Sequence, residues 1–160
     1  MRSRFVNFLI VTGLAAAVDQ AIKAAMVQLL AGAGPIAVTP FLNLRLGYNT
    51  GVSFSMFAET FRDTPWLLAA IMMGIVLLVA VFAIRAERRI EGFSYGLIAG
   101  GAVGNIIDRL RLGAVVDYID LFYAGWRWPT FNLADSLIFL GVTLLVGTGL
   151  FAPKGRMIGP

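Results

Sequence analysis

The sequence predicts an all-α membrane protein, in which four transmembrane helices carry a small extracytoplasmic β-hairpin or sheet and loop insertions. Of its 160 residues, 59% are hydrophobic and only 14% are charged, and the mean hydropathy is +0.83. A soluble domain is about half apolar and roughly a quarter charged, so this chain cannot cover itself with polar surface. The apolar residues gather in segments of spanning length. We expect one integral membrane domain over residues 1–160, with approximate spans 5–28, 65–84, 92–110 and 134–152 and outer loops 29–64 and 111–133.

The chain contains neither cysteine nor histidine. This composition excludes disulfides and thiol catalysis, and it also excludes a histidine general base and the usual zinc sites. The net charge is +4, but the basic residues stand at the ends of apolar segments rather than in an aromatic-interleaved patch. We therefore expect no nucleic-acid partner and no metal or other cofactor. Carboxylates, amides, hydroxyls and a few cations are left to carry any chemistry.

The first apolar segment has two possible interpretations. Residues 5–18 with the small residues Ala15–Ala17 also fit a signal peptide and its cleavage site. Apolar residues continue to Leu30, however, which gives the length of a membrane span. Asp19 and Lys23 are spaced i, i+4 and can pair on one helix face. A buried pair that fixes helix packing is favoured over a catalytic role for these two residues.

The first long loop alternates apolar and polar residues at 42–46 and again at 52–56. The residues between them, 47–51, have turn composition, so we predict a β-hairpin with one apolar face that rests on lipid or on the helices. Asn49 lies in the predicted turn, where asparagine tolerates left-handed backbone. A turn role and an active-site role for Asn49 are about equally supported.

The remaining segments predict the three other helices and their orientation. Thr64-Pro65 is a helix-start signal. The third segment has small-residue spacing that permits close helix approach, from Gly96, Gly100, Gly101 and Gly104. The short segments at the two chain ends and at 85–91 are basic, so the positive-inside rule places both termini in the cytoplasm and the two long loops outside.

Polar residues collect from 104 to 136, where two predicted spans meet the outer interface. Asn105, Asp108 and Arg109 end one span, and Asn132 and Asp135 begin the next. Ionisable groups in membrane segments are costly and are functional candidates by default. Asp108 and Arg109 are adjacent and point to different sides of the helix, so each is expected to pair elsewhere. A polar network that ties the third span to the loops is the favoured role for these two charges.

Two acids in this region have opposite surroundings. Asp117 stands between Val115-Val116 and Tyr118-Ile119, where burial would raise its pKa. Asp135 lies in the first turn of the fourth span, where backbone N–H groups favour the ionised form and where Asn132 can cap the helix. Ordinary capping explains Asp135 alone, but two acids pushed in opposite directions are typical of an acid–base pair. Asp120 is a less favoured substitute for Asp117, or a solvated loop acid.

With these residues in place, the chain resembles the bacterial lipoprotein signal peptidases, or type II signal peptidases, which are aspartic peptidases. Five blocks carry the resemblance in order along nearly the whole chain: Asp19-Gln20 with Lys23, Asn49-Thr50-Gly51-Val52-Ser53-Phe54-Ser55, Gly104-Asn105-Ile106-Ile107-Asp108-Arg109, Val115-Val116-Asp117-Tyr118 and Phe131-Asn132-Leu133-Ala134-Asp135-Ser136. The resemblance implies that Asp117 and Asp135 are catalytic. It implies supporting or substrate-binding roles for Asn49, Asn105, Asp108, Arg109, Asn132, Asp19 and Lys23.

The resemblance also implies the reaction and its setting. The substrate would be a diacylglyceryl-modified prolipoprotein, cut just before the lipidated cysteine near the outer face of the bacterial inner membrane. Membrane lipids are the other expected partners, and a monomer is sufficient for this chemistry. Two alternatives remain at this point. A small proton-coupled transporter would place its acids near the bilayer midplane, whereas these acids lie at one interface. A non-catalytic membrane assembly protein would have no need for two acids in opposed environments.

Overall fold

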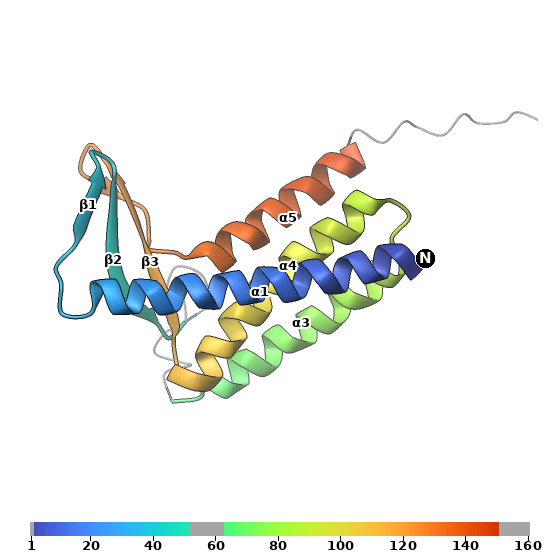
Figure 1. The fold of residues 1–160 in the computed structure, drawn as a ribbon, viewed down its shortest axis with the longest axis horizontal. Coiled ribbons are helices and arrows are strands. Elements are labelled where there is room, and N and C mark those ends of the chain that lie inside the picture. The colour runs from blue at the N-terminus through green and yellow to red at the C-terminus, as the bar shows by residue number, and fades with distance from the viewer. Residues whose placement is uncertain (1, 52–62, 151–160) are drawn as a thin grey trace, which may run out of the picture.

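The computed structural model describes residues 2–51 and 63–150. Within these ranges the chain forms a bundle of four helices with a small antiparallel sheet at one end (Figure 1). The elements in chain order are α1 (Arg2–Leu30), β1 (Ile36–Thr39), β2 (Leu42–Asn49), α3 (Pro65–Arg85), α4 (Arg89–Leu112), β3 (Val115–Tyr123), β4 (Trp126–Arg127) and α5 (Leu133–Leu150).

Three helices in the described part of the chain are long and apolar enough to cross a membrane. They are α1 from Arg4 to Leu30, α3 and α5. The remaining predicted span, 92–110, coincides with α4, but α4 carries more glycines and charges and does not reach the same hydropathy. The reason is its position, since α4 packs against all three other helices and buries most of its surface on protein. Three of the four predicted spans are therefore supported by length and composition.

Glycines let α1 approach α4 closely. A Cβ atom on Gly100 would lie 2.5 Å from the Ala15 Cβ and 2.8 Å from the Thr12 carbonyl oxygen, both on α1. Gly96 and Gly104 face α1 in the same way, whereas Gly101 faces the first turn of α5. The predicted role of the small residues in close helix packing is confirmed. Helix α1 also runs unbroken through Ala15–Ala17, which favours the span over the signal-peptide interpretation.

A glycine turn connects the central helix to the sheet. Gly113 follows α4 with φ of 75°, and its N–H donates to the Arg109 carbonyl, which closes the helix. A left-handed residue after the last turn is a common helix end, and glycine adopts it without strain. The chain reverses here, so β3 begins beside the last turns of α4. This turn brings Asp117 next to the polar end of α4.

The sheet corrects the predicted hairpin. The strands of the described residues pair antiparallel in the order β1-β2-β3-β4, and β2 continues through residues 47–49, where we predicted a turn. Gly47 pairs with Asp117, and Asn49 pairs with Val115, so Asn49 is a strand residue. The hairpin that forms is β1–β2, which turns at Pro40-Phe41. The strand predicted at 52–56 lies outside the described residues, as do the last two residues of the fourth predicted span.

The error in the hairpin has a physical cause. Residues 42–49 keep an alternating pattern through Tyr48, and their partner is the distant strand β3, whose nine residues are rich in valine, tyrosine and phenylalanine. Long-range pairing with such a strand outweighs the local turn preference of Gly47 and Asn49. Residues 111–133, predicted as an outer loop, therefore contain the central strand of the sheet.

The two ends of the bundle differ. The sheet lies where α1 and α4 end and α5 begins, whereas the start of α1, the α3–α4 connection and the last turn of α5 lie together at the far end (Figure 1). At that far end the Arg4 guanidinium donates to the Ala86 carbonyl at 2.7 Å. Asp117 and the polar end of α4 thus lie at the sheet end, whereas the basic α3–α4 connection lies at the far end.

Candidate active site

Asn132 and Asp135 form a reciprocal cap at the start of α5. The Asp135 N–H donates to the Asn132 side-chain oxygen at 3.0 Å, and the Asn132 N–H donates to the Asp135 carboxylate at 3.2 Å. Such a capping box satisfies N–H groups that have no partner within the helix. The predicted cap at the start of α5 is therefore present. The cap occupies one oxygen of the Asp135 carboxylate. The other oxygen accepts a hydrogen bond from the Asn105 amide at 2.9 Å.

Asp117 is buried on β3 and faces the start of α5. Its side chain is 3% exposed and accepts hydrogen bonds from the Asn132 amide at 2.7 Å and from the Asn49 amide at 3.3 Å. Burial raises the pKa of Asp117 to about 7, and the negative charge of Asp135 contributes to the rise, against the opposing effect of these hydrogen bonds and of Lys23. The predicted rise in the Asp117 pKa is thus present, and its main cause is desolvation.

Two asparagines connect the carboxylates. The Asn132 amide donates both to Asp117 and, at 3.3 Å, to the Asn105 side-chain oxygen, and the Asn105 amide donates to Asp135. Asp117, Asn132, Asn105 and Asp135 therefore form one hydrogen-bonded chain from three separate elements, β3, α4 and the α5 cap. The two acids that the sequence singled out meet at one place.

The Asp19–Lys23 pair is formed and lies beneath this chain. The Lys23 ammonium lies 2.9 Å from the Asp19 carboxylate and 2.8 Å from the Asp108 carboxylate, and it donates to the Asn105 side-chain oxygen at 2.8 Å. Asp19 also accepts a hydrogen bond from the Ala134 N–H at 3.0 Å. These contacts join α1, α4 and α5, which supports the packing role favoured for the pair.

Asp108 and Arg109 point to different partners, as predicted. Asp108 accepts from the Val116 N–H at 3.1 Å and so holds the start of β3 against α4. Arg109 donates to the Gly51 carbonyl at 2.6 Å and thereby holds the chain just after β2. Both charges thus tie α4 to the sheet end of the molecule, in agreement with the network predicted for them.

Asp120 differs from both roles considered for it. It is fully buried, so it is not a solvated loop acid. Successive strand residues point to opposite faces, so Asp120, three residues after Asp117, lies on the other face of β3 and cannot replace it. Its ion-pair partner is Arg127 of β4.

Two polar side chains of the site were absent from the sequence-based set of site residues. Gln20 donates to Asp108 at 2.8 Å and to the Gly104 carbonyl at 3.1 Å, and Tyr118 accepts a hydrogen bond from the Leu133 N–H at 3.3 Å. Both belong to motif blocks around Asp19 and Asp117. Gln20 and Lys23 are spaced i, i+3, which places both on one face of the helix. This spacing was the signal that could have added Gln20 to the site residues.

The site can perform acid–base chemistry with carboxylates and amides. Among residues 2–51 and 63–150, no cluster of acidic side chains is arranged to hold a metal ion. A buried acid with a pKa raised to about 7 lies beside a second carboxylate at a helix N-terminus. Two such groups can activate a water molecule and protonate a leaving group.

Comparison with known proteins identifies a relationship over most of the chain. The family model described as signal peptidase (SPase) II matches residues 11–151. The lipoprotein signal peptidase of Aeromonas hydrophila is 40% identical over 150 residues, which cover 92% of this chain and 90% of the relative. That of Serratia marcescens is 42% identical over 150 residues, which cover 91% of this chain and 86% of the relative.

Solved structures agree with the sequence relationship. A bacterial membrane enzyme with 25% identity superposes with a TM-score of 0.81, covering 96% of this chain and 93% of its own. A second, with 26% identity, has a TM-score of 0.74 and coverages of 91% and 94%. Sequence and fold relationships thus extend over the same region, which includes both carboxylates. The chain belongs to the signal peptidase II family.

Proposed function

We propose that Asp117 and Asp135 are the catalytic pair with which this signal peptidase removes signal peptides from prolipoproteins. The observation that carries the proposal is the hydrogen-bonded chain that joins the two carboxylates through Asn132 and Asn105. The two acids have different surroundings, since Asp117 is buried with a pKa of about 7 and Asp135 caps a helix. Different surroundings allow one acid to hold a proton while the other is ionised.

In the proposed reaction, a water molecule lies between the two carboxylates and attacks the scissile carbonyl carbon. Asp135 accepts one proton of the water as the new carbon–oxygen bond forms. Asp117 gives its proton to the leaving nitrogen as the carbon–nitrogen bond breaks. The products are a carboxylic acid and an amine, and proton exchange with water returns the pair to its starting state.

The neighbouring polar residues have supporting roles in this proposal. Asn132, Asn105 and Asn49 orient the carboxylates through the hydrogen bonds described above. Arg109 holds the chain at Gly51, close to where an extended substrate would lie beside β2. Asp19, Lys23 and Asp108 fix α1, α4 and β3 relative to one another. These roles follow from contacts, and none of them requires a cofactor.

The proposed substrate is a prolipoprotein whose cysteine already carries a diacylglyceryl group, cut just before that cysteine. The site lies at one end of a bundle whose outer helices are strongly apolar, so a lipid-anchored substrate can reach it from the bilayer. We further propose that α4 also spans the membrane, that both termini are cytoplasmic, and that the enzyme acts as a monomer in the bacterial inner membrane. The central position of α4 among three apolar helices supports a membrane-spanning α4.

Cleavage of a diacylglyceryl prolipoprotein by purified protein in detergent tests the catalytic pair. D117N and D135N should each lose cleavage by more than about 100-fold, as expected for the loss of an acid–base group. The exposed acid Asp63 provides a matched control in D63N, which should cut like wild type. Thermal melting should show that all variants fold. Full activity in a folded D117N or D135N would exclude that residue as catalytic.

A further inference from the structure

The face of β3 opposite Asp117 carries an ion pair that the proposed reaction does not use. Asp120 is fully buried, and its carboxylate pairs with the guanidinium of Arg127, a residue that is half exposed. The other carboxylate oxygen of Asp120 has no hydrogen-bond partner among the described residues. Arg127 also lies over the Phe122 ring, 5.5 Å from its centre. The pair thus joins β3 to β4 on the face of β3 opposite the Asp117 side chain.

The segment that this pair holds leads directly to the site. After β4, the Trp128 N–H donates to the Leu121 carbonyl at 2.8 Å, and Phe131 exchanges backbone hydrogen bonds with Ile119 at 2.8 and 3.1 Å. The next residue is Asn132, whose amide donates to Asp117. The segment 121–131 therefore turns back along β3 and leads to Asn132, whose amide reaches Asp117.

We propose that the Asp120–Arg127 ion pair is a positioning element that keeps Asn132 in hydrogen-bond contact with Asp117. The inference rests on the proposed function, because it assigns the pair a role in setting the geometry of the catalytic carboxylates. Arg127 pairs with neither carboxylate of the site and acts only through the backbone of residues 128–132.

The physical basis is the free-energy cost of leaving the buried Asp120 carboxylate without a cation. A buried carboxylate without a cation is strongly disfavoured, so loss of Arg127 would draw Asp120 toward water. Such a movement separates β4 from β3 and loosens the backbone bonds that lead to Asn132. Loss of the Asn132 hydrogen bond removes an interaction that favours the ionised form of Asp117. Asp117 would then hold its proton to higher pH.

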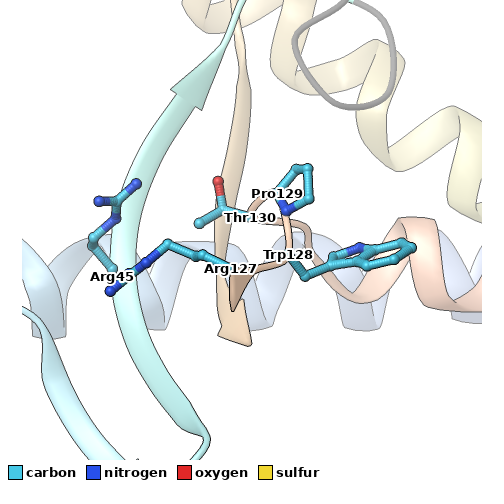
Figure 2. Close-up of a pocket in the computed structure, with 5 residues that line it drawn as sticks. All are labelled: Arg45, Arg127, Trp128, Pro129 and Thr130. Carbon is cyan, nitrogen blue, oxygen red and sulfur yellow. The ribbon is translucent and has the colours of Figure 1, made fainter. Parts of the chain in front are cut away.

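A cavity of about 240 Å³ beside the pair supplies a matched control. Figure 2 shows Arg45 and Arg127 among the residues that line this cavity, Arg45 from β2 and Arg127 from β4. Both arginines are exposed, but the ion pair with Asp120 is made by Arg127. Substitution of Arg45 therefore removes the same charge from the same cavity without disturbing the pair.

The test measures kcat, KM and their pH dependence for wild type, R127A, R127K, D120N and R45A with a diacylglyceryl prolipoprotein. The charged groups that face Asp117 from other elements are Lys23 of α1, Arg109 of α4 and Asp135 of α5, and none of these variants changes them. We expect R127A to lower kcat about tenfold with little change in KM, and to move the loss of activity at high pH upward by about half a pH unit or more. R127K should restore most of kcat, and R45A should match wild type.

Other results would overturn the inference. If R127A lowers only the melting temperature, while kcat and the pH profile of the folded enzyme stay as in wild type, the pair is merely structural. If R127A fails to fold, it is combined with D120N, because the double variant removes the ion pair and leaves no buried carboxylate without a cation. An unshifted pH profile in the folded double variant then excludes the role. Failure of the proposed function would give a different result, because D117N would then retain activity whatever the effect of R127A.

Discussion

At the scale of single residues, burial controls the chemistry of Asp117. The carboxylate is 3% exposed, and desolvation is the largest cause of its pKa of about 7. Two amide donors oppose this effect but do not cancel it. The carboxylate therefore holds a proton at pH values where an ordinary aspartate has lost it.

The raised pKa of Asp117 predicts a dependence of stability on pH. The folded protein keeps this proton between pH 3.8 and about 7, whereas the unfolded chain has released it, so the contribution of Asp117 to stability falls as the pH rises through this window. From about pH 5 to about pH 8 the loss is about 3 kcal/mol, at about 1.4 kcal/mol for each pH unit up to about 7.

D117N has no such proton to lose. Its free energy of unfolding, relative to that of wild type, should therefore increase between about pH 5 and about pH 8. Chemical denaturation in detergent at the two pH values measures this difference. Equal pH dependence in wild type and D117N would contradict a buried carboxylate at position 117.

Lys23 is predicted to be the cation on which packing at the site depends. K23M leaves Asp19 and Asp108 buried without their shared partner, and breaking a buried ion pair costs about 3–5 kcal/mol. R111M, at an exposed arginine of α4, is the control and should change the free energy of unfolding by less than about 0.5 kcal/mol. Similar denaturation midpoints for K23M and R111M would show that Lys23 is not structurally important.

The sequence was informative about these residues to different degrees. Spacing alone indicated the Asp19–Lys23 pair, and the apolar neighbours of Asp117 indicated its raised pKa. The pairing of Asp120 with Arg127 was not predictable, because it depends on how β3 and β4 meet. Asp120 looked like a loop acid since nothing local shows that its strand is central to a sheet.

At the scale of elements, helix contacts depend on glycine where α1 meets α4. G100A would bring a methyl group within 2.5 Å of the Ala15 Cβ, and such overpacking costs about 1–3 kcal/mol. G74A in α3 is the matched control, because no atom lies within 4 Å of its added Cβ. It should stabilise the helix by about 0.5–1 kcal/mol.

Melting temperatures of the two glycine variants, measured in the same detergent, should therefore move in opposite directions. If G100A melts no lower than wild type, the close packing of α1 on α4 is not required for stability. The prediction of small-residue packing from sequence succeeded because glycine spacing is a local property of one helix.

The strands were harder to predict than the helices. Turn residues at 47–51 indicated a local hairpin, but β2 pairs with β3, which is about 70 residues away along the chain. No local pattern specifies such a partner. The composition of residues 115–123, rich in β-branched and aromatic residues, was the signal that could have identified β3.

At the scale of the whole molecule, the arginines at the start of α1 and around the α3–α4 connection, at the end away from the sheet, predict the orientation in the membrane. The chain has no cysteine, so a single introduced thiol reports one position. A33C, at the sheet end, should react with a membrane-impermeant maleimide in intact cells, because we place this end outside. E87C, in the α3–α4 connection, should react only after permeabilisation. Labelling of E87C in intact cells would reverse the proposed orientation.

The bundle shows why the sequence predicted the helices well, whereas the span at α4 is supported only in part. Each apolar run is long enough to identify a helix by itself. The membrane character of α4 depends on its neighbours, since a helix covered by protein on most sides needs less hydropathy than one that faces lipid. The glycines and charges of α4 therefore lower its mean hydropathy. The packing of the bundle requires these same residues in this helix.

We propose that Asp117 acts as the proton donor, with a raised pKa, beside Asp135. The pH dependence of prolipoprotein cleavage by wild-type enzyme tests this role, with stability checked at each pH. Because Asp117 must be protonated to act, we expect activity to fall by about tenfold for each pH unit above about 7. Activity that stays constant from about pH 7 to about pH 9 in folded enzyme would contradict it.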